Sequence, residues 1–165
     1  MLAGKSLMIT GGTGSFGTTV LNRFLQTDIR EIVIFSRDEK KQNDMREKFH
    51  SEKLKFYLGD VRDYNSIKYA MTDVDYVFHA AALKQVPAAE YNPFEAIKTN
   101  ILGTENVINA AIENNVSKII ALSTDKAANP ANLYGATKLC SDKLMVAGNI
   151  LAGSRDIKFA IVRYG

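Results

Sequence analysis

Hydrophobic positions along the chain gather into six short runs separated by longer segments of mixed character. The runs are Leu7–Thr10, Ile32–Phe35, Leu54–Leu58, Val74–Phe78, Lys118–Leu122 and Phe159–Val162. Most of them are apolar at consecutive rather than alternating positions, which is typical of β-strands covered on both faces. The pattern therefore predicts six buried strands.

The segments between the runs repeat apolar residues every three or four positions, as in Phe16, Val20 and Phe24, or in Phe94, Ile97 and the residues that follow. Alternating strand and helix signals indicate a parallel sheet with right-handed crossovers. We expect an α/β fold, a doubly wound parallel sheet that forms one domain over residues 1–165. A chain of this length buries roughly 70% of its unfolded surface in a single core.

Composition and charge limit the class of protein but do not indicate a particular reaction. The 165 residues carry 21 Lys and Arg against 18 Asp and Glu, a net charge of +3, without the basic stripe that nucleic acid requires. The single Cys140 excludes an internal disulfide and a zinc site built on paired thiolates, so we expect no metal. With no apolar run near ~18 residues and no signal peptide, we expect no membrane partner and a cytoplasmic location.

A glycine-rich loop follows the first predicted strand and opens a helical segment. The sequence GGTGSFG, from Gly11 to Gly17, contains both GxxGxxG and GxGxxG spacings. In this context the glycines allow a pyrophosphate close to the backbone at a helix N-terminus, so the loop predicts a dinucleotide-binding Rossmann domain; the alternative is a purely structural turn. The candidate cofactor residues here are Gly11, Thr13, Gly14, Ser15, Phe16 and Gly17.

The end of the second strand, where an acidic residue would favour NAD, reads Phe35-Ser36-Arg37. Hydroxyl donors and positive charge suit a 2′-phosphate, so Ser36, Arg37 and Lys41 favour NADP over NAD. A structural interpretation is compatible with this one. Ser36 and Glu39 have capping-box spacing, and Arg37 can be solvated on the first turn of the helix.

The third and fourth strands end in further candidates. Asp60 and Val61 follow the third strand, where Asp60 either accepts a hydrogen bond from the adenine amine or caps the helix that starts near Asp63. After the fourth strand, small residues let backbone lie against a dinucleotide: Ala80, Ala81 and Ala82. His79 lacks partners at ligand spacing and is expected to be a hydrogen-bonded structural histidine rather than a metal ligand.

The fifth strand leads into Ser123-Thr124-Asp125-Lys126, and Tyr134 and Lys138 follow four residues apart, on one face of a predicted helix. A tyrosine with a pKa near 10 needs a depression of about three units, roughly 4 kcal/mol, to act as a base near neutrality. A nearby ammonium and a cationic nicotinamide ring provide such a depression. After a glycine-rich cofactor loop, this YxxxK pattern is a strong signal of hydride-transfer chemistry.

At this point the chain resembles the extended short-chain dehydrogenase/reductases. The segments that carry the resemblance are TGGTGSFG, SRDE, GDVRD, HAAALKQVP, EYNPFEAIKTN, ALSTDKAANP and NLYGATK. Within that family they are most similar to the C5-inverting UDP-N-acetylglucosamine 4,6-dehydratases of surface-polysaccharide and flagellin-glycan biosynthesis. The resemblance implies a Rossmann sheet of strand order 3-2-1-4-5-6, bound NADP and a UDP-N-acetylglucosamine substrate.

The resemblance also assigns roles to residues. Tyr134 and Lys138 match the family's catalytic pair, Thr124 the hydroxyl that binds sugar O4, and Asp125 and Lys126 the acid/base pair of the inverting enzymes. Lys84 and Asn100 fall where the family contacts cofactor or substrate, with Lys84 also a candidate for the substrate. Homo-oligomers through the helices at 93–115 and 132–148 are implied as well.

The chain departs from the family at its end. Family members continue beyond the strand that ends in Arg163-Tyr164-Gly165 into a C-terminal substrate-binding domain, which we expect to be absent from this polypeptide. The alternative to a dehydratase is therefore a truncated, inactive NADP-binding or dimerisation module.

Overall fold

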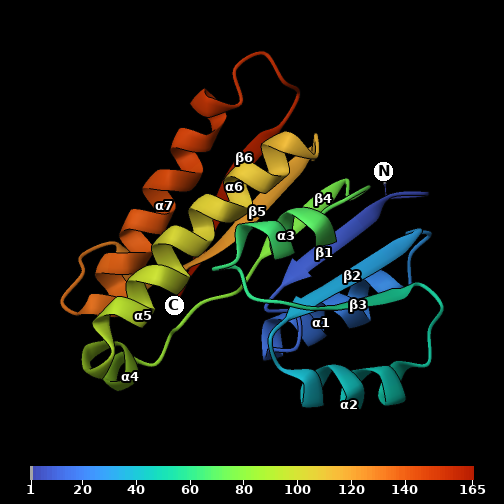
Figure 1. The fold of residues 1–165 in the computed structure, drawn as a ribbon, viewed down its shortest axis with the longest axis horizontal. Helices are drawn as coiled ribbons and strands as arrows, with labels where there is room; N and C mark the ends of the chain where they lie inside the picture. The colour runs from blue at the N-terminus through green and yellow to red at the C-terminus, as the bar shows by residue number, and fades with distance from the viewer. Residues whose placement is uncertain (1) are drawn as a thin grey trace.

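A computed structural model describes residues 2–165 as a single six-stranded parallel sheet flanked by helices (Figure 1). The strand order is β3-β2-β1-β4-β5-β6, as the sequence predicted. The strands are β1 Ser6–Thr10, β2 Glu31–Ser36, β3 Leu54–Leu58, β4 Tyr76–His79, β5 Lys118–Thr124 and β6 Lys158–Tyr164. All five pairings between neighbours are parallel.

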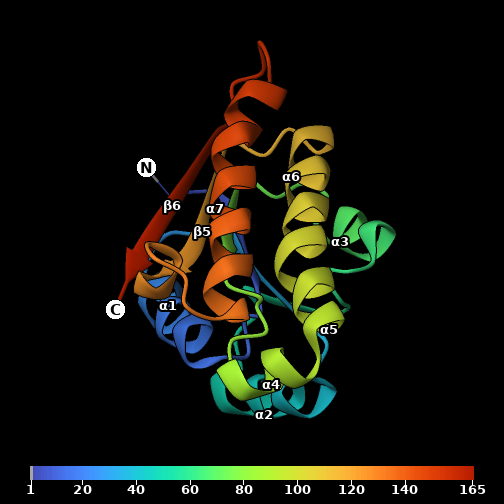
Figure 2. The same ribbon diagram turned by 90° about the vertical axis from the view of Figure 1, so that its left-hand side faces the viewer.

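Helical segments connect the strands and cover both faces of the sheet. They are α1 Ser15–Leu25, α2 Glu39–Phe49, α3 Tyr64–Ala70, α4 Val86–Tyr91, α5 Pro93–Ile97, η1 Lys98–Leu102, α6 Gly103–Glu113, η2 Asp125–Ala127 and α7 Leu133–Leu151. Figure 2 shows α6 and α7 side by side in front of the sheet, with α1 beyond it. Within residues 2–165, no helix combines the length and apolar character needed to cross a bilayer.

Two apolar clusters, one on each face of the sheet, explain why the strand runs are continuous. Met8 and Val33 point into the cluster beneath α3, α6 and α7, whereas their neighbours Ile9 and Ile34 point into the cluster beneath α1 and α2. All four side chains are at most 2% exposed. Because successive side chains alternate between faces, a strand buried on both sides needs apolar residues at every position.

Several predicted boundaries differ from the structure. The fourth strand begins at Tyr76 rather than Val74, and β6 extends to Tyr164. The helix expected over 93–115 is interrupted by the π-helical turn η1, whose residues include Asn100. Hydrophobic spacing does not reveal such a turn, because one widened turn shifts the pattern by a single position.

Neither residue that the sequence analysis considered as a helix cap, Ser36 or Asp60, takes that position. Asp38, not Ser36, is the N-cap of α2, and its carboxylate accepts from the Lys41 amide at 3.0 Å. The Ser36 hydroxyl instead accepts from the amide of Asp38 at 3.2 Å. Asp63, not Asp60, caps α3. In both cases a carboxylate one residue before the helix takes the cap, and the predicted residue faces the edge of the sheet.

Candidate active site

A cleft of about 370 Å³ lies at the carboxyl ends of the strands, where parallel sheets of this order bind ligands. It spans the point between β1 and β4 at which the strand order reverses. Predicted residues that line it are Gly11, Thr13, Gly14, Ser15, Phe16, Gly17, Ser36, Arg37, Lys41, Asp60, Val61, Ala80, Ala81, Ala82, Lys84, Tyr134 and Lys138. The sequence therefore located most of one continuous surface.

The glycine loop holds β1, β4 and α1 closer together than side chains would allow. Gly11 has a φ of 65°, and a Cβ there would lie 2.9 Å from the Cα of Ala81. A Cβ on Gly17 would lie 2.2 Å from the Gly12 carbonyl oxygen. Gly14, the N-cap of α1, supplies no capping side chain, so the first amides of α1 are available to an anion.

Hydroxyl and basic groups gather beside the loop, at the end of β2. The Thr13 hydroxyl donates to the Ser36 hydroxyl at 3.1 Å, joining the loop to β2. A guanidinium nitrogen of Arg37 lies 3.6 Å from the Asp60 carboxylate. The Lys41 ammonium lies 3.1 Å from the Asp38 carboxylate. Both cations are paired with a carboxylate, and their side chains are more than 60% exposed.

Asp60 belongs to an ion-pair chain on the cleft rim. Burial alone would raise its pKa, but hydrogen bonds from Arg62, the shorter at 2.7 Å, outweigh burial and hold the pKa below its usual value. Arg62 also contacts Glu95 of α5. Asp60 is therefore a permanent acceptor at the cleft, and its expected contact with adenine stays a prediction.

Tyr134 and Lys138 lie one turn apart on α7, and both line the cleft. Burial raises the pKa of Tyr134, while a hydrogen bond with Thr124 acts in the opposite direction. The depression that the sequence argument required is thus not present in the protein alone. Burial lowers the pKa of Lys138 to about 8, with Asp142 opposing that shift.

Thr124, Asp125 and Lys126 lie beyond the cleft lining, at its outer edge. The Thr124 hydroxyl donates to the Asp125 carboxylate at 3.0 Å, and the Lys126 ammonium lies 3.4 Å from the same oxygen. The hydrogen bond from Thr124, together with Lys126, lowers the pKa of Asp125. These contacts therefore favour the ionised form of the Asp125 carboxylate.

Gly135 brings the start of α7, which carries Tyr134 and Lys138, close to the turn that carries Asp125 and Lys126. A Cβ on Gly135 would lie 2.4 Å from the Lys126 carbonyl oxygen, so α7 begins in direct backbone contact with η2. Asn132 caps α7 by accepting from the Gly135 amide at 2.9 Å. The sequence YGATK thus places Tyr134 beside the turn that carries Lys126.

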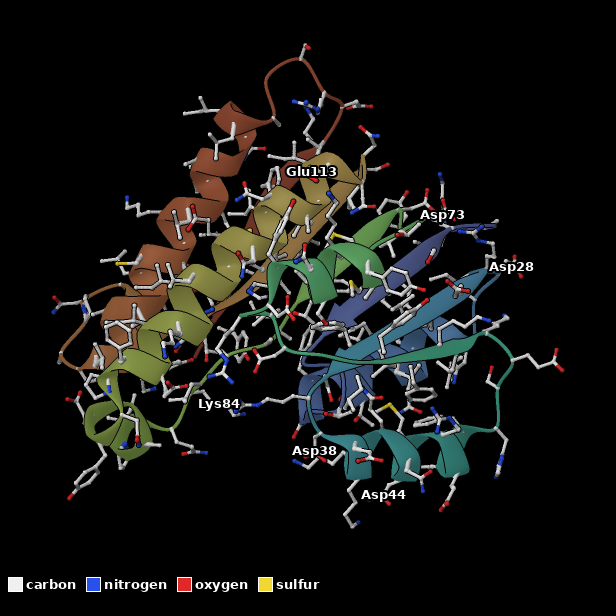
Figure 3. All side chains as sticks on the ribbon, in the orientation of Figure 1. Asp28, Asp38, Asp44, Asp73, Lys84 and Glu113 are labelled. Atoms are coloured by element: carbon white, nitrogen blue, oxygen red, sulfur yellow. The ribbon has the colours of Figure 1, made fainter. Side chains whose placement is uncertain are left out.

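Lys84 and Asn100, predicted together, are placed differently. Lys84 lies on the loop after β4 and lines the cleft; Figure 3 shows it at the same edge of the molecule as Asp38. Asn100 is 1% exposed and does not line the cleft. Its amide group exchanges two hydrogen bonds with the backbone of Leu83, at 2.8 and 2.9 Å. Asn100 therefore positions the segment that carries Lys84, and its expected contact with a ligand stays a prediction.

His79 is a fully hydrogen-bonded structural histidine, as predicted. Its Nδ1 lies 2.7 Å from the Thr10 hydroxyl and its Nε2 lies 3.1 Å from that of Thr104. Thr104 donates its own proton to the Asn100 carbonyl at 2.7 Å, so Nε2 donates to Thr104 and Nδ1 accepts from Thr10. Both ring nitrogens are occupied in the neutral form.

The neutral His79 predicts an acid-sensitive fold. Burial lowers its pKa from 6.5 to about 3, so between these values the unfolded chain binds a proton that the folded chain does not. Stability is expected to fall as the pH decreases from 6.5 toward 3, by up to about 1.4 kcal/mol per pH unit from this group. Urea unfolding of wild type and His79→Gln across this range measures the difference; parallel pH profiles would contradict it.

Several cleft residues were missed by the sequence analysis. They are Phe35, Asp38, Gly59, Thr99, Leu122, Ser123 and Tyr164. Thr99 is the most informative, because its hydroxyl is buried without a hydrogen-bond partner in the part of the chain that is described. Its position on the π-helical turn gave no signal in the sequence.

The cleft fits a dinucleotide on structural grounds. A Cβ at Gly11 would fill the space on the floor of the cleft. The N-terminus of α1 faces the cleft without a capping side chain. The buried Thr99 hydroxyl, which lacks a hydrogen-bond partner within the described residues, also lines it. Fold and site together are those of the cofactor-binding part of an extended short-chain dehydrogenase/reductase. Residues 7–165 match the family described as polysaccharide biosynthesis protein, and the chain belongs to this family.

Relatives within the family carry two different names. The chain is 57% identical to a UDP-N-acetylglucosamine 4,6-dehydratase (inverting) of Campylobacter jejuni and 58% identical to a UDP-glucose 4-epimerase of Rickettsia rickettsii. Each match covers the whole chain and 50% of the relative. The crystal structure of Pen from Bacillus thuringiensis matches with a TM-score of 0.97 at 42% identity, over 100% of this chain and 51% of that one. The chain thus spans about half the length of the relatives it matches.

Proposed function

We propose that this chain carries the NADP-binding and proton-transfer part of a UDP-N-acetylglucosamine 4,6-dehydratase, of the C5-inverting type. The observation that carries the proposal is the Thr124–Asp125–Lys126 cluster, held by Gly135 against the start of the helix that bears Tyr134 and Lys138. Oxidation at C4 requires only Tyr134 and Lys138. A dehydration also requires a base for the C5 proton and an acid for the departing 6-hydroxyl, and Lys126 and Asp125 offer both.

The first step uses Tyr134, Lys138 and Thr124. When bound, NADP⁺ would accept the hydride from sugar C4 and, after water is lost across C5 and C6, return it to C6 while a solvent-derived proton adds at C5. Tyr134 takes the O4 proton as phenolate, and Thr124 holds O4 in place. Since burial raises the pKa of Tyr134 in the protein alone, the lowering must come from the positive charges assembled in the ternary complex, the Lys138 ammonium among them.

The second step uses Asp125 and Lys126. A neutral Lys126 removes the acidified C5 proton, and a protonated Asp125 assists loss of the 6-hydroxyl as water. In the protein alone, hydrogen bonds from Thr124 and Lys126 lower the pKa of Asp125 and so favour its ionised form. A substrate that covers this exposed pair would favour its neutral form, and the 3.4 Å separation suits the proton transfer.

An epimerase is the second candidate, because relatives of equal similarity carry that name. Both reactions begin with oxidation at C4, so the Tyr134–Lys138 pair does not distinguish them. An epimerase returns the hydride to C4 of a reoriented sugar and has no use for a C5 base. The adjacent Asp125 and Lys126 therefore favour dehydration.

We further propose that α6 and α7 form a self-association surface. Exposed apolar side chains lie on α7, at Val146 and Ile150, and on the segments that lead into α6: Tyr91 of α4, Phe94 of α5 and Leu102 of η1. An apolar group of this kind on adjacent helices suits a bundle with a second copy of the chain. A monomer at micromolar concentrations in analytical ultracentrifugation would contradict this part of the proposal.

The test of function is NMR analysis of products from UDP-N-acetylglucosamine and NADP⁺. It is best performed with the chain joined to the part of the Campylobacter relative that it does not match. A 4-keto-6-deoxy sugar with solvent deuterium at C5 is expected. The C4 epimer as sole product would favour the epimerase, and cofactor binding without any product would favour the inactive module.

Cofactor preference gives a further prediction. Because Ser36, Arg37 and Lys41 surround the site expected for the 2′-phosphate, NADP is expected to bind roughly 10- to 100-fold more tightly than NAD, from a charge-assisted contact of about 1.5–3 kcal/mol. Arg37→Met should remove most of this difference and leave NAD affinity nearly unchanged. Calorimetric titration measures both, and tighter binding of NAD to the wild type would refute the assignment.

A further inference from the structure

Asp142 is a buried carboxylate that the proposed mechanism does not use. It lies on α7 and is 3% exposed. Its Oδ2 accepts hydrogen bonds from the Ser123 hydroxyl at 2.8 Å and from two guanidinium nitrogens of Arg163 at 3.0 and 2.9 Å. Ser123 is on β5 and Arg163 is on β6, so one carboxylate joins the helix to the ends of two strands.

Asp142 also lies in register with the catalytic candidates. Tyr134, Lys138 and Asp142 are each four residues apart on α7, a spacing that places them along one face of the helix. Lys138 is 4% exposed, and no ion pair within 4 Å involves it among residues 2–165. The only acidic residue one turn away on this buried face is Asp142.

We propose that Asp142 is a positioning residue for the Tyr134–Lys138 pair, which anchors α7 to β5 and β6 and supplies the negative charge that keeps Lys138 an ammonium ion in a buried site. The importance of that ammonium for catalysis rests on the proposed function. The placement of Tyr134, Lys138 and Asp142 and the charge near Lys138 are independent of that function.

The other charged groups near Lys138 do not replace Asp142. From β4, His79 is neutral, and from β6, Arg163 is cationic and bonded to Asp142 itself. From η2, Asp125 is already bonded to Thr124 and Lys126. From η1 and α6, Asn100 and Thr104 present neutral groups to α7.

Electrostatics and geometry agree on this role. Burial lowers the pKa of Lys138 to about 8, and the Asp142 charge is the influence that raises it. Without that charge, more of the lysine would be neutral at physiological pH. Arg163 partly offsets the carboxylate, so removal of Arg163 should act on Lys138 in the opposite direction.

The experiment titrates Lys138 in the free 165-residue chain by NMR of ¹³C-labelled lysines, with the signal assigned by its loss in Lys138→Arg. Asp142→Asn keeps the shape of the side chain and removes its charge. The Lys138 midpoint is expected to fall by about one pH unit. Arg163→Met removes the opposing cation and should raise the midpoint, although both variants lose the same link between α7 and β6.

These opposite shifts distinguish the proposal from a purely structural role. If Asp142 only fastened the helix, both variants would lower the melting temperature and move the midpoint in the same direction or not at all, and either result overturns the proposal. Should Asp142→Asn fail to fold, Arg163→Met carries the test alone, and an unchanged or lowered midpoint overturns it. No cofactor or substrate is present, so failure of the proposed function leaves this result intact.

Discussion

Tyr134→Phe is expected to abolish the first oxidation, whereas Lys126→Ala should leave it and stop the reaction at the next step. In the proposed mechanism Tyr134 acts before a 4-ketone exists and Lys126 acts only afterwards. A general base contributes about 10²–10⁴-fold, so each loss should be clear of assay noise. The measurement is NADPH absorbance in a single turnover, combined with deuterium incorporation at C5, in the chain completed with the second part of the Campylobacter relative.

The control is Lys143→Ala, an exposed lysine on α7, which should behave as wild type. If Lys126 only neutralises Asp125, its variant should lose a little stability and still turn over. Wild-type deuterium incorporation by Lys126→Ala would show that another group removes the C5 proton. A normal burst of NADPH from Tyr134→Phe would show that Tyr134 is not the base for oxidation at C4.

Gly17→Ala is expected to destabilise the chain by about 3 kcal/mol and to eliminate cofactor binding. Its Cβ would lie 2.2 Å from the Gly12 carbonyl oxygen, and backbone on both sides cannot yield without moving α1 away from β1. The loop would then lose the geometry that brings its amides to a phosphate. Urea unfolding followed by circular dichroism, with calorimetric titration of NADP, measures both effects.

Gly14→Ala is the matched control within the same loop. Its φ is −77°, and its Cβ would meet only the Gly11 carbonyl oxygen, at 3.3 Å. We expect a stability loss below about 1 kcal/mol, which reflects the weaker capping by alanine. Equal losses at the two positions would mean that close packing of α1 on the loop does not explain the need for glycine.

The sequence predicted the sheet and most of the cleft because both rest on local patterns. Continuous apolar runs required strands buried on two faces, and the glycine spacing required a tight strand-to-helix turn at Gly11. His79 could be predicted as a structural residue because the sequence offers it no partner at metal-ligand spacing. These features depend on a few neighbouring residues, so the sequence alone specifies them.

The features that the sequence analysis did not predict depend on contacts across the fold. Choosing between Ser36 and Asp38 as the cap required knowing that Ser36 is occupied by Thr13 from another segment. The burial of Asn100 and the π-helical turn that contains it depend on the backbone of Leu83. The raised pKa of Tyr134 follows from burial, which residue spacing does not report.

The close contact of Gly135 with Lys126 has a mechanical consequence. That contact, the bonds of Asp142 to Ser123 and Arg163, and the 3.0 Å approach of a Cβ at Gly148 to the Phe159 ring fix α7 to the strands along its length. The helix that bears Tyr134 and Lys138 is therefore held to the strands at several points, whereas α2, next to Arg37 and Lys41, has far fewer contacts with the sheet. Any local opening of the cleft is expected beside α2 rather than along α7.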